Sequence, residues 1–310
     1  MTEKIVVLTG GVGGAKLVLG LCQVMPADQV VAIVNTGDDF EHLGLNISPD
    51  IDTLLYTLAL KADREKGWGR ADESWNFMAA LRSLGGEDWF QLGDGDLVLH
   101  ILRTAQLRAG HALSTVTAQF AAAWNIGVSV LPMSDDPVAT IVTTDEGDLA
   151  FQRYFVERRC MPQVSAIRFE GAGMARAAPG VLEAITDPAT SAIVIAPSNP
   201  YLSIDPILSV PGISDALRNS VAPVVAVSPI VGGKAVKGPT AKLMAELGQS
   251  VSLSTIARHY EGLIDGLLID SGDDGSALGV ASAATDIMMN SLTDRARVAR
   301  ATLALAQTLR

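Results

Sequence analysis

The chain has 310 residues, of which 48% are hydrophobic and 18% charged, and its formal net charge is −11. A chain of this length buries a substantial core without disulfides, and its two cysteines, Cys22 and Cys160, are too few for a disulfide scaffold. The acidic balance argues against nucleic acid and anionic lipid as partners, because either would require a basic face.

The apolar segments are too short to cross a membrane. Uninterrupted stretches such as residues 192–197 and 221–227 are far shorter than the roughly 20 residues that a bilayer requires. The apolar run at residues 5–8 is also too short for the core of a signal peptide. We therefore expect a cytoplasmic protein in which these runs are buried strands.

Short β-branched runs alternate with segments of helical periodicity along the chain. This alternation is typical of a parallel sheet that is covered on both faces by helices. The sequence predicts strands over residues 4–9, 30–35, 192–196, 221–227 and 266–270. We therefore predict an α/β fold, Rossmann-like, with a mostly parallel, doubly wound sheet.

A region of helical patterns interrupts this alternation. The helices are predicted over residues 51–61, 74–84, 97–108 and 114–124. Residues 138–143 and 149–156 then flank a polar connection that contains Gly147, as in an antiparallel hairpin. A last helix is predicted over residues 292–309. We expect a single α/β domain over residues 1–310, with a helical insertion at about residues 51–130.

A glycine-rich turn follows the first predicted strand and precedes an amphipathic helix. It contains Gly10, Gly11, Gly13 and Gly14 and is followed closely by Lys16. Such a turn lets the backbone approach a pyrophosphate, and the helix N-terminus offers N–H groups. Neither the dinucleotide pattern nor the Walker A pattern is matched. The turn is either a phosphate-binding loop or a tight strand-to-helix connection.

Two acidic segments follow the second predicted strand. Their polar residues are Asn35, Thr36, Asp38, Asp39, Asp50 and Asp52. The first segment lies at the carboxyl end of the strand, where open α/β sheets bind ligands. Magnesium on a phosphate uses one or two carboxylates with substrate oxygens, which suits these acids. The alternatives are a solvated turn for the first segment and a capped helix start for the second.

Two further polar turns each follow a buried strand. One contains Ser198 and Asn199, and the other contains Ser228 and Gly232. Both are expected at the same edge of the sheet as the glycine-rich turn, so they are candidates to read a base or ribose. Each turn taken alone is also compatible with an ordinary connection.

Taken together, these motifs resemble the 2-phospho-L-lactate transferase family of coenzyme F420 biosynthesis. The resemblance runs nearly end to end and rests on a set of segments in the same order. They are TGGVGG at 9–14, VNTGDD at 34–39, SPDIDT at 48–53, LGDGD at 92–96, PMSD at 132–135, PSNP at 197–200 and VSPIV at 227–231.

The resemblance implies a transferase with two small-molecule substrates. Its donor would be a phospho-acid activated as a guanosine diphosphate derivative, and its acceptor the deazaflavin alcohol FO. The reaction would require magnesium, release GMP and form F420-0 or a variant. Phospholactate, phosphoenolpyruvate and related acids all remain open as the transferred group. A homodimer is also implied.

The resemblance extends to site residues. Asp50 matches a family position that contacts FO, and Gln91 stands where the family commonly has a basic residue that does the same. Asp50 and Asp38 are expected to be catalytic and to hold the metal. The residues expected to bind the nucleotide are Gly10, Gly11, Gly13, Gly14, Asn35, Thr36, Ser198, Asn199, Ser228 and Gly232.

Two other functions are compatible with a glycine-rich turn after the first strand. A nicotinamide dehydrogenase is disfavoured because Lys16 replaces the third glycine and because Asn35, not an acid, ends the second strand. A non-catalytic regulator that binds a nucleotide is the more serious alternative. The acidic segments at residues 35–39 and 48–52 favour the transferase over this regulator.

Overall fold

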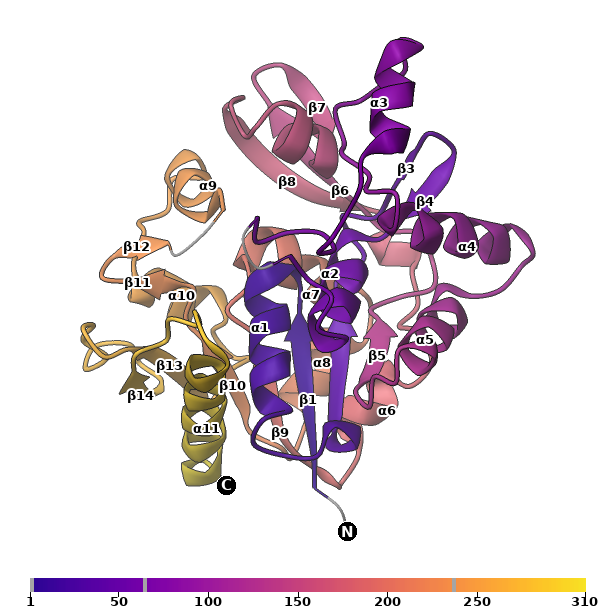
Figure 1. Cartoon of the computed structure of the whole chain (residues 1–310). Helices are drawn as coiled ribbons and strands as arrows, with labels where there is room; N and C mark the ends of the chain where they lie inside the picture. Colours follow the sequence, from indigo (N-terminus) through magenta and orange to yellow (C-terminus); the bar gives the residue numbers. More distant parts are fainter. Residues whose placement is uncertain (1–2, 64–65, 236–237) are drawn as a thin grey trace.

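The computed structural model describes residues 3–63, 66–235 and 238–310. Its centre is a seven-stranded sheet of order β14-β13-β10-β9-β1-β2-β5 (Figure 1). Every neighbouring pair of strands in this sheet is parallel. The strands are β1 (Lys4–Thr9), β2 (Val30–Val34), β5 (Ser129–Pro132), β9 (Thr190–Ile195), β10 (Val224–Val227), β13 (Gly266–Asp270) and β14 (Ala281–Thr285). The predicted Rossmann-like α/β fold is confirmed.

The order of strands reverses between β1 and β9. From β1 the chain adds β2 and β5 on one side, and it then returns to β9 and adds β10, β13 and β14 on the other. Such a reversal leaves a crevice at the carboxyl ends of the two central strands, where open sheets bind ligands. Leu8 of β1 pairs with Ile195 of β9, so the loops that follow these strands begin side by side.

Helices cover both faces of the central sheet. Successive residues of a strand point to opposite faces, so strands that are apolar throughout need helices on both sides. Ile5 and Val7 of β1 belong to one core cluster, whereas Val6 and Leu8 belong to another. The first cluster includes residues of α1 (Gly11–Leu21), α2 (Pro49–Leu58), α5 (Leu113–Ala123) and α11 (Leu292–Thr308). The second includes residues of α6 (Val181–Thr186), α7 (Asp205–Ser209), α8 (Ile213–Arg218), α9 (Thr240–Glu246) and α10 (Leu253–His259).

Smaller elements lie beyond the carboxyl ends of the central strands (Figure 1). A three-stranded antiparallel sheet contains β6 (Ala139–Thr144), β7 (Gly147–Ala150) and β8 (Val164–Glu170). Two hairpins pair β3 (Phe40–His42) with β4 (Leu45–Ile47) and β11 (Ile230–Val231) with β12 (Lys234–Ala235). The remaining helices are α3 (Asn76–Ser83) and α4 (Asp96–Arg108), with short helical turns η1 (Ala27–Gln29), η2 (Arg153–Glu157), η3 (Ala172–Met174) and η4 (Pro200–Ile204).

The second half of the predicted hairpin is wrong beyond Ala150. Residues 151–156, expected to continue a strand, instead enter a helical turn that includes η2. Phe151 and Phe155 lie four residues apart and stack with ring centroids 5.3 Å apart, as on one face of a helix. Tyr154 between them is fully buried. The aromatic spacing was therefore helical, although the residue types favour strands.

Two strands of the central sheet were not predicted. β14 consists of Ala281–Thr285, whose residues are small, and most of them are exposed at the edge of the sheet. β5 is short, ends at Pro132 and forms the other edge. Edge strands need few apolar residues, so the pattern that reveals central strands is weak there. Within the described ranges, no helix is long and apolar enough to span a lipid bilayer.

Candidate functional site

Asp50 joins the start of α2 to the glycine-rich turn. Its Oδ1 accepts a hydrogen bond from Gly11 N at 2.7 Å, and its Oδ2 accepts one from Asn35 Nδ2 at 3.0 Å. Pro49 at the first helical position and an acid in the first turn both favour a helix start here. The helix start and these two hydrogen bonds therefore hold the carboxylate beside the segments that follow β1 and β2.

Asp38 shares the Asn35 amide with Asp50. Asn35 Nδ2 donates to Asp38 Oδ1 at 3.0 Å, and Asn35 Oδ1 accepts from Gly37 N at 2.8 Å, which orients the amide. The other oxygen of Asp38, Oδ2, accepts from Gln152 Nε2 at 3.3 Å. Asp38 and Asp50 are only 6% and 7% exposed. The two predicted catalytic acids thus lie together, beside a glutamine for which no sequence motif provided a signal.

Burial raises the pKa of both carboxyl groups. The pKa of Asp50 rises to about 6, although the hydrogen bonds from Asn35 and Gly11 act in the opposite direction. The pKa of Asp38 rises well above its ordinary value because of burial first and the charge of Asp50 second. Two buried carboxylates that share one neutral amide are costly to ionise together. A cation between them would remove this cost.

The donor set suits a hard cation that prefers oxygen ligands. In the same segment as Asp38, Asp39 Oδ1 and Thr36 Oγ1 are also buried and have no hydrogen-bond partner among the described residues. Over the same residues, no three His, Cys, Asp or Glu side chains are grouped to hold a metal. Magnesium commonly takes one or two carboxylates and completes its shell with water and substrate phosphates. The residues present therefore fit magnesium bound together with a phosphate ligand.

The glycines of the turn are required by close contacts. A Cβ atom on Gly10 would lie 2.5 Å from Asp50 Oδ2, and one on Gly13 would lie 2.5 Å from the carbonyl oxygen of Pro197. Ser198 Oγ donates to the carbonyl oxygen of Gly10 at 2.7 Å. The loop after β9 is thus held against the turn after β1. Because α1 begins at Gly11, its first N–H groups lie at this junction, and those that follow the Gly11 N–H bonded to Asp50 can bind an anion.

The other predicted nucleotide-binding residues lie in the loops after β9 and β10. Asn199 caps η4 through Oδ1, whereas its buried Nδ2 has no hydrogen-bond partner in the described part of the chain. Ser228 Oγ exchanges hydrogen bonds with the backbone of Ile230 and so shapes its own turn. Gly232 N donates to Asp273 Oδ2 at 3.1 Å. Asn199 is therefore the residue of this group with a donor left for a ligand.

Gln91 lies in the loop between α3 and α4. Its Oε1 accepts from Arg82 Nη2 at 2.7 Å, and its Nε2 donates to the carbonyl oxygen of Asp88 at 2.7 Å. These bonds hold Gln91 within its own loop. The loop is tied to η2 by Arg153, whose guanidinium lies 4.3 Å from the Trp89 ring centre. Contact between Gln91 and a ligand stays a prediction.

Asp52 is paired with an arginine, whereas an acid of a magnesium and phosphate site would be left for the metal. It forms an ion pair with Arg103 of α4, with Nη1 and Oδ2 3.1 Å apart, and Arg103 is 1% exposed. Asp39 accepts from Ser48 Oγ at 2.6 Å, and burial raises its pKa. The acidic segments therefore divide into two parts. Asp38 and Asp50 face the glycine-rich turn, whereas Asp52 neutralises a buried arginine.

Comparisons with known proteins agree over nearly the whole chain. Residues 5–304 match the family described as 2-phospho-L-lactate transferase CofD. Proteins named phosphoenolpyruvate transferase from Kitasatospora aureofaciens and Streptomyces griseus are 43% and 44% identical, over 99% of both chains in each case. One from Mycobacterium sp. (strain JLS) is 37% identical over 98% of both chains.

A solved structure has the same fold. It is the crystal structure of a UPF0052 family member from Bacillus halodurans, which superposes with a TM-score of 0.62 and covers 98% of this chain and 99% of its own. The two sequences are 18% identical, so this likeness concerns the fold alone.

Proposed function

Because the chain belongs to the 2-phospho-L-lactate transferase family CofD, we propose that it makes the phosphodiester of F420-0 or a variant. It would move a phospho-acid from its guanosine diphosphate-activated form to the terminal ribityl hydroxyl of FO and release GMP. The name shared by the curated relatives, phosphoenolpyruvate transferase, supports phosphoenolpyruvate as the acid. A cytoplasmic location and a homodimer are further parts of this proposal.

One observation carries the proposal. Asp38 and Asp50 share the Asn35 amide beside Gly11, at the strand-order reversal of the sheet. Transfer of a phosphoryl group needs positioning and neutralisation of charge more than covalent help from the protein. A glycine-rich turn with a helix N-terminus, next to two carboxylates, supplies both needs.

Different residues of the site would bind the metal, the diphosphate and the guanosine. Magnesium, held by Asp38 and Asp50, would neutralise negative charge that develops on the phosphate oxygens. The backbone of residues 10–14 would bind the diphosphate. Asn199 would contact the guanosine through Nδ2, while Ser198, Ser228 and Gly232 would shape the turns that seat it. Asp50 would also accept the proton of the attacking hydroxyl, because a carboxylate beside that hydroxyl can act as a general base. Asn35 and Gln152 would orient Asp38.

The experiment is incubation of the protein with FO, magnesium and a series of guanylylated phospho-acids, followed by mass spectrometry. We expect the phosphodiester and an equal amount of GMP, with most product from activated phosphoenolpyruvate. The alternative is a non-catalytic regulator that binds a nucleotide. Binding of GDP without product from any activated acid would favour that regulator and reject the transferase.

A further inference from the structure

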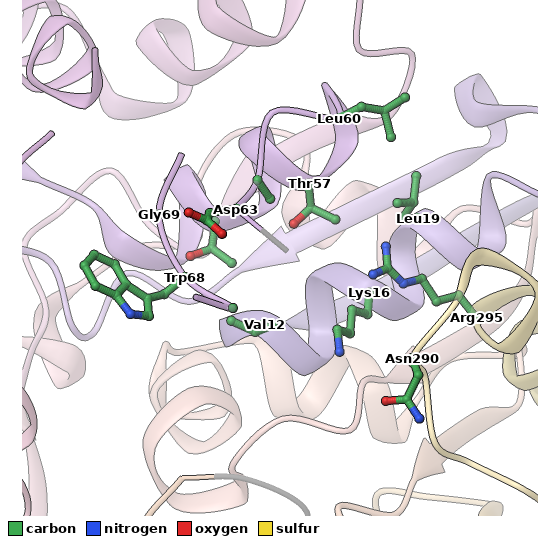
Figure 2. A pocket seen from close by; sticks show the side chains of 13 residues that line it. Val12, Lys16, Leu19, Thr57, Leu60, Asp63, Trp68, Gly69, Asn290 and Arg295 are labelled. Carbon is green, nitrogen blue, oxygen red and sulfur yellow. The ribbon is translucent and has the colours of Figure 1, made fainter. Parts of the chain in front are cut away.

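A cavity of about 260 Å³ lies between α1, α2, α11 and the chain around Trp68 (Figure 2). Its wall combines charged, polar and apolar side chains. The described residues that line it include Val12, Lys16, Thr53, Thr57, Asp63, Trp68, Asn290 and Arg295. Sites for drug-sized ligands commonly measure about 300–1,000 Å³. This cavity therefore suits a group smaller than a nucleoside or a three-ring deazaflavin.

The cavity adjoins the proposed reaction site. Val12, which lines it, directly follows Gly11, whose N–H binds Asp50 Oδ1. Thr53, which also lines it, lies less than one helical turn beyond Asp50 on α2. A short group attached to a phosphorus atom beside Asp50 would therefore reach the cavity past Val12 and Thr53.

The described charges of the wall favour an anion. Lys16 and Arg295 approach the cavity from α1 and α11 (Figure 2), and Asp63 is the one acid among the described lining residues. Lys16, Arg295 and Asp63 all make further contacts, so an anion bound here would add to contacts that these side chains already make. Thr57 and Asn290 add neutral groups that can form hydrogen bonds. The wall thus offers two cations and polar neighbours to a small anionic group.

The position of Arg295 depends on a close approach of two helices. A Cβ atom on Gly20 of α1 would collide with the carbonyl oxygen of Arg295. The missing side chain at Gly20 lets α11 lie directly against α1, in a contact close to Lys16. No sequence motif indicated this arrangement, because Arg295 lies in the last helix, far along the chain from the motifs of the site.

The other sizeable cavity beside the site has the opposite character. It measures about 510 Å³ and is lined by residues that include Thr36, Ser48 and five acids. The acids are Asp39, Glu41, Asp135, Asp136 and Glu170, and the described lining includes no lysine or arginine. Negative groups raise the energy of an anion bound among them. An acid that carries a carboxylate is therefore better accommodated between α1, α2 and α11.

We propose that the cavity between α1, α2 and α11 binds the carboxylate end of the transferred phospho-acid, with Arg295 and Lys16 as its charged partners. The planar guanidinium of arginine matches a carboxylate in two parallel hydrogen bonds, which makes Arg295 the main determinant. This inference rests on the proposed function, because it assigns one end of the same donor substrate. It makes these two cations the residues that distinguish a phospho-acid from a phosphoester that lacks the carboxylate.

Binding without turnover tests the assignment. Two donors are compared by calorimetry in the absence of FO: guanylylated phosphoenolpyruvate, and a guanosine diphosphate ethyl ester that lacks the carboxylate. We expect Arg295→Gln and Lys16→Met each to weaken binding of the first donor by about tenfold to a hundredfold, and to leave the second unchanged. Arg295→Lys should recover part of the affinity. Arg300→Gln, on an exposed site of the same helix, is the matched control.

The kinetic test uses the same proteins with FO and magnesium. The loss in kcat/KM should appear with the carboxylate donor and not with the ethyl ester, while the KM for FO stays constant. Equal losses with both donors, or no loss with either, would overturn the assignment. If the wild type forms no product but Arg295→Gln still removes the preference for the carboxylate in calorimetry, the proposed function fails and the cavity assignment stands.

Discussion

Asn35 donates from a single amide nitrogen to Asp50 Oδ2 at 3.0 Å, and the same nitrogen lies 3.0 Å from Asp38 Oδ1. Asn35 is fully buried, so its amide is shielded from bulk water. A neutral amide satisfies one lone pair on each acid but supplies no charge to offset two carboxylates. The site is therefore arranged for a cation and is energetically unfavourable without one.

This arrangement predicts that the free protein loses stability as pH rises. Burial raises the pKa of Asp50 from 3.8 to about 6, so the folded state retains a proton that the unfolded state releases in this interval. The part of the cost that comes from Asp50 begins near pH 4 and is complete above pH 6. Asp38→Asn removes one charge of the pair and should stabilise the magnesium-free protein at pH 7 by about 1–3 kcal/mol.

Urea unfolding at pH 4.5 and pH 7, in the presence of a chelator, measures this difference. Asp28→Asn, at an exposed position, serves as the control for removal of a negative charge. Magnesium should stabilise the wild type more than Asp38→Asn. An Asp38→Asn protein that is no more stable than the wild type at pH 7 would contradict the electrostatic account of the pair.

Asp50→Asn should abolish turnover while GDP still binds. The amide oxygen can still accept the Gly11 hydrogen bond, so the glycine-rich turn keeps its geometry, whereas the negative charge and the proton acceptor are lost. We expect kcat to fall by about 10²–10⁴-fold, the range typical for a general base. Turnover by mass spectrometry and GDP affinity by calorimetry check the two halves of this prediction. Near-normal turnover would remove Asp50 from the catalytic role.

The elements of the central sheet could largely be read from the sequence because their signals are local. β1 and β13 have the predicted bounds, β2 and β10 lie within the predicted runs, and β9 overlaps its predicted run but begins two residues earlier, at Thr190. Local signals failed for residues 151–156, where aromatic residues favour a strand but pack with helical spacing. Strand propensity is weaker than tertiary packing in such a segment.

The site was predictable only where its residues belong to short motifs. Asp38 and Asp50 stand in motifs next to glycines and turns, so their type and position along the sheet indicated a shared edge. Gln152 contacts Asp38 across 114 residues of sequence and belongs to no motif. The role of Asp52 was also hidden, because its partner Arg103 lies 51 residues away on another helix. Such pairings depend on the packing of whole elements, which spacing along the chain does not reveal.

Gly10→Ala should impair the site more than it impairs the fold. The new Cβ atom would meet Asp50 Oδ2 at 2.5 Å and the Ser203 side chain at 2.7 Å, so the Asp50 carboxylate must move. We expect a loss of about 1–3 kcal/mol in stability from overpacking and a loss of magnesium-dependent activity. Gly173→Ala, where no atom lies within 4 Å, is the control. Unchanged activity in Gly10→Ala would show that Asp50 does not need its present position.

The Asp52–Arg103 pair should be structural, and a double-mutant cycle can show this. Arg103 is 1% exposed and is bonded to Asp52 by two nitrogens, so removing either partner leaves a buried charge uncompensated. Asp52→Asn and Arg103→Met should each cost about 3–5 kcal/mol, whereas the double variant should cost less than their sum. Urea unfolding gives the four free energies. Additive losses would mean that the two charges do not depend on each other, and would return Asp52 to consideration as a ligand-binding acid.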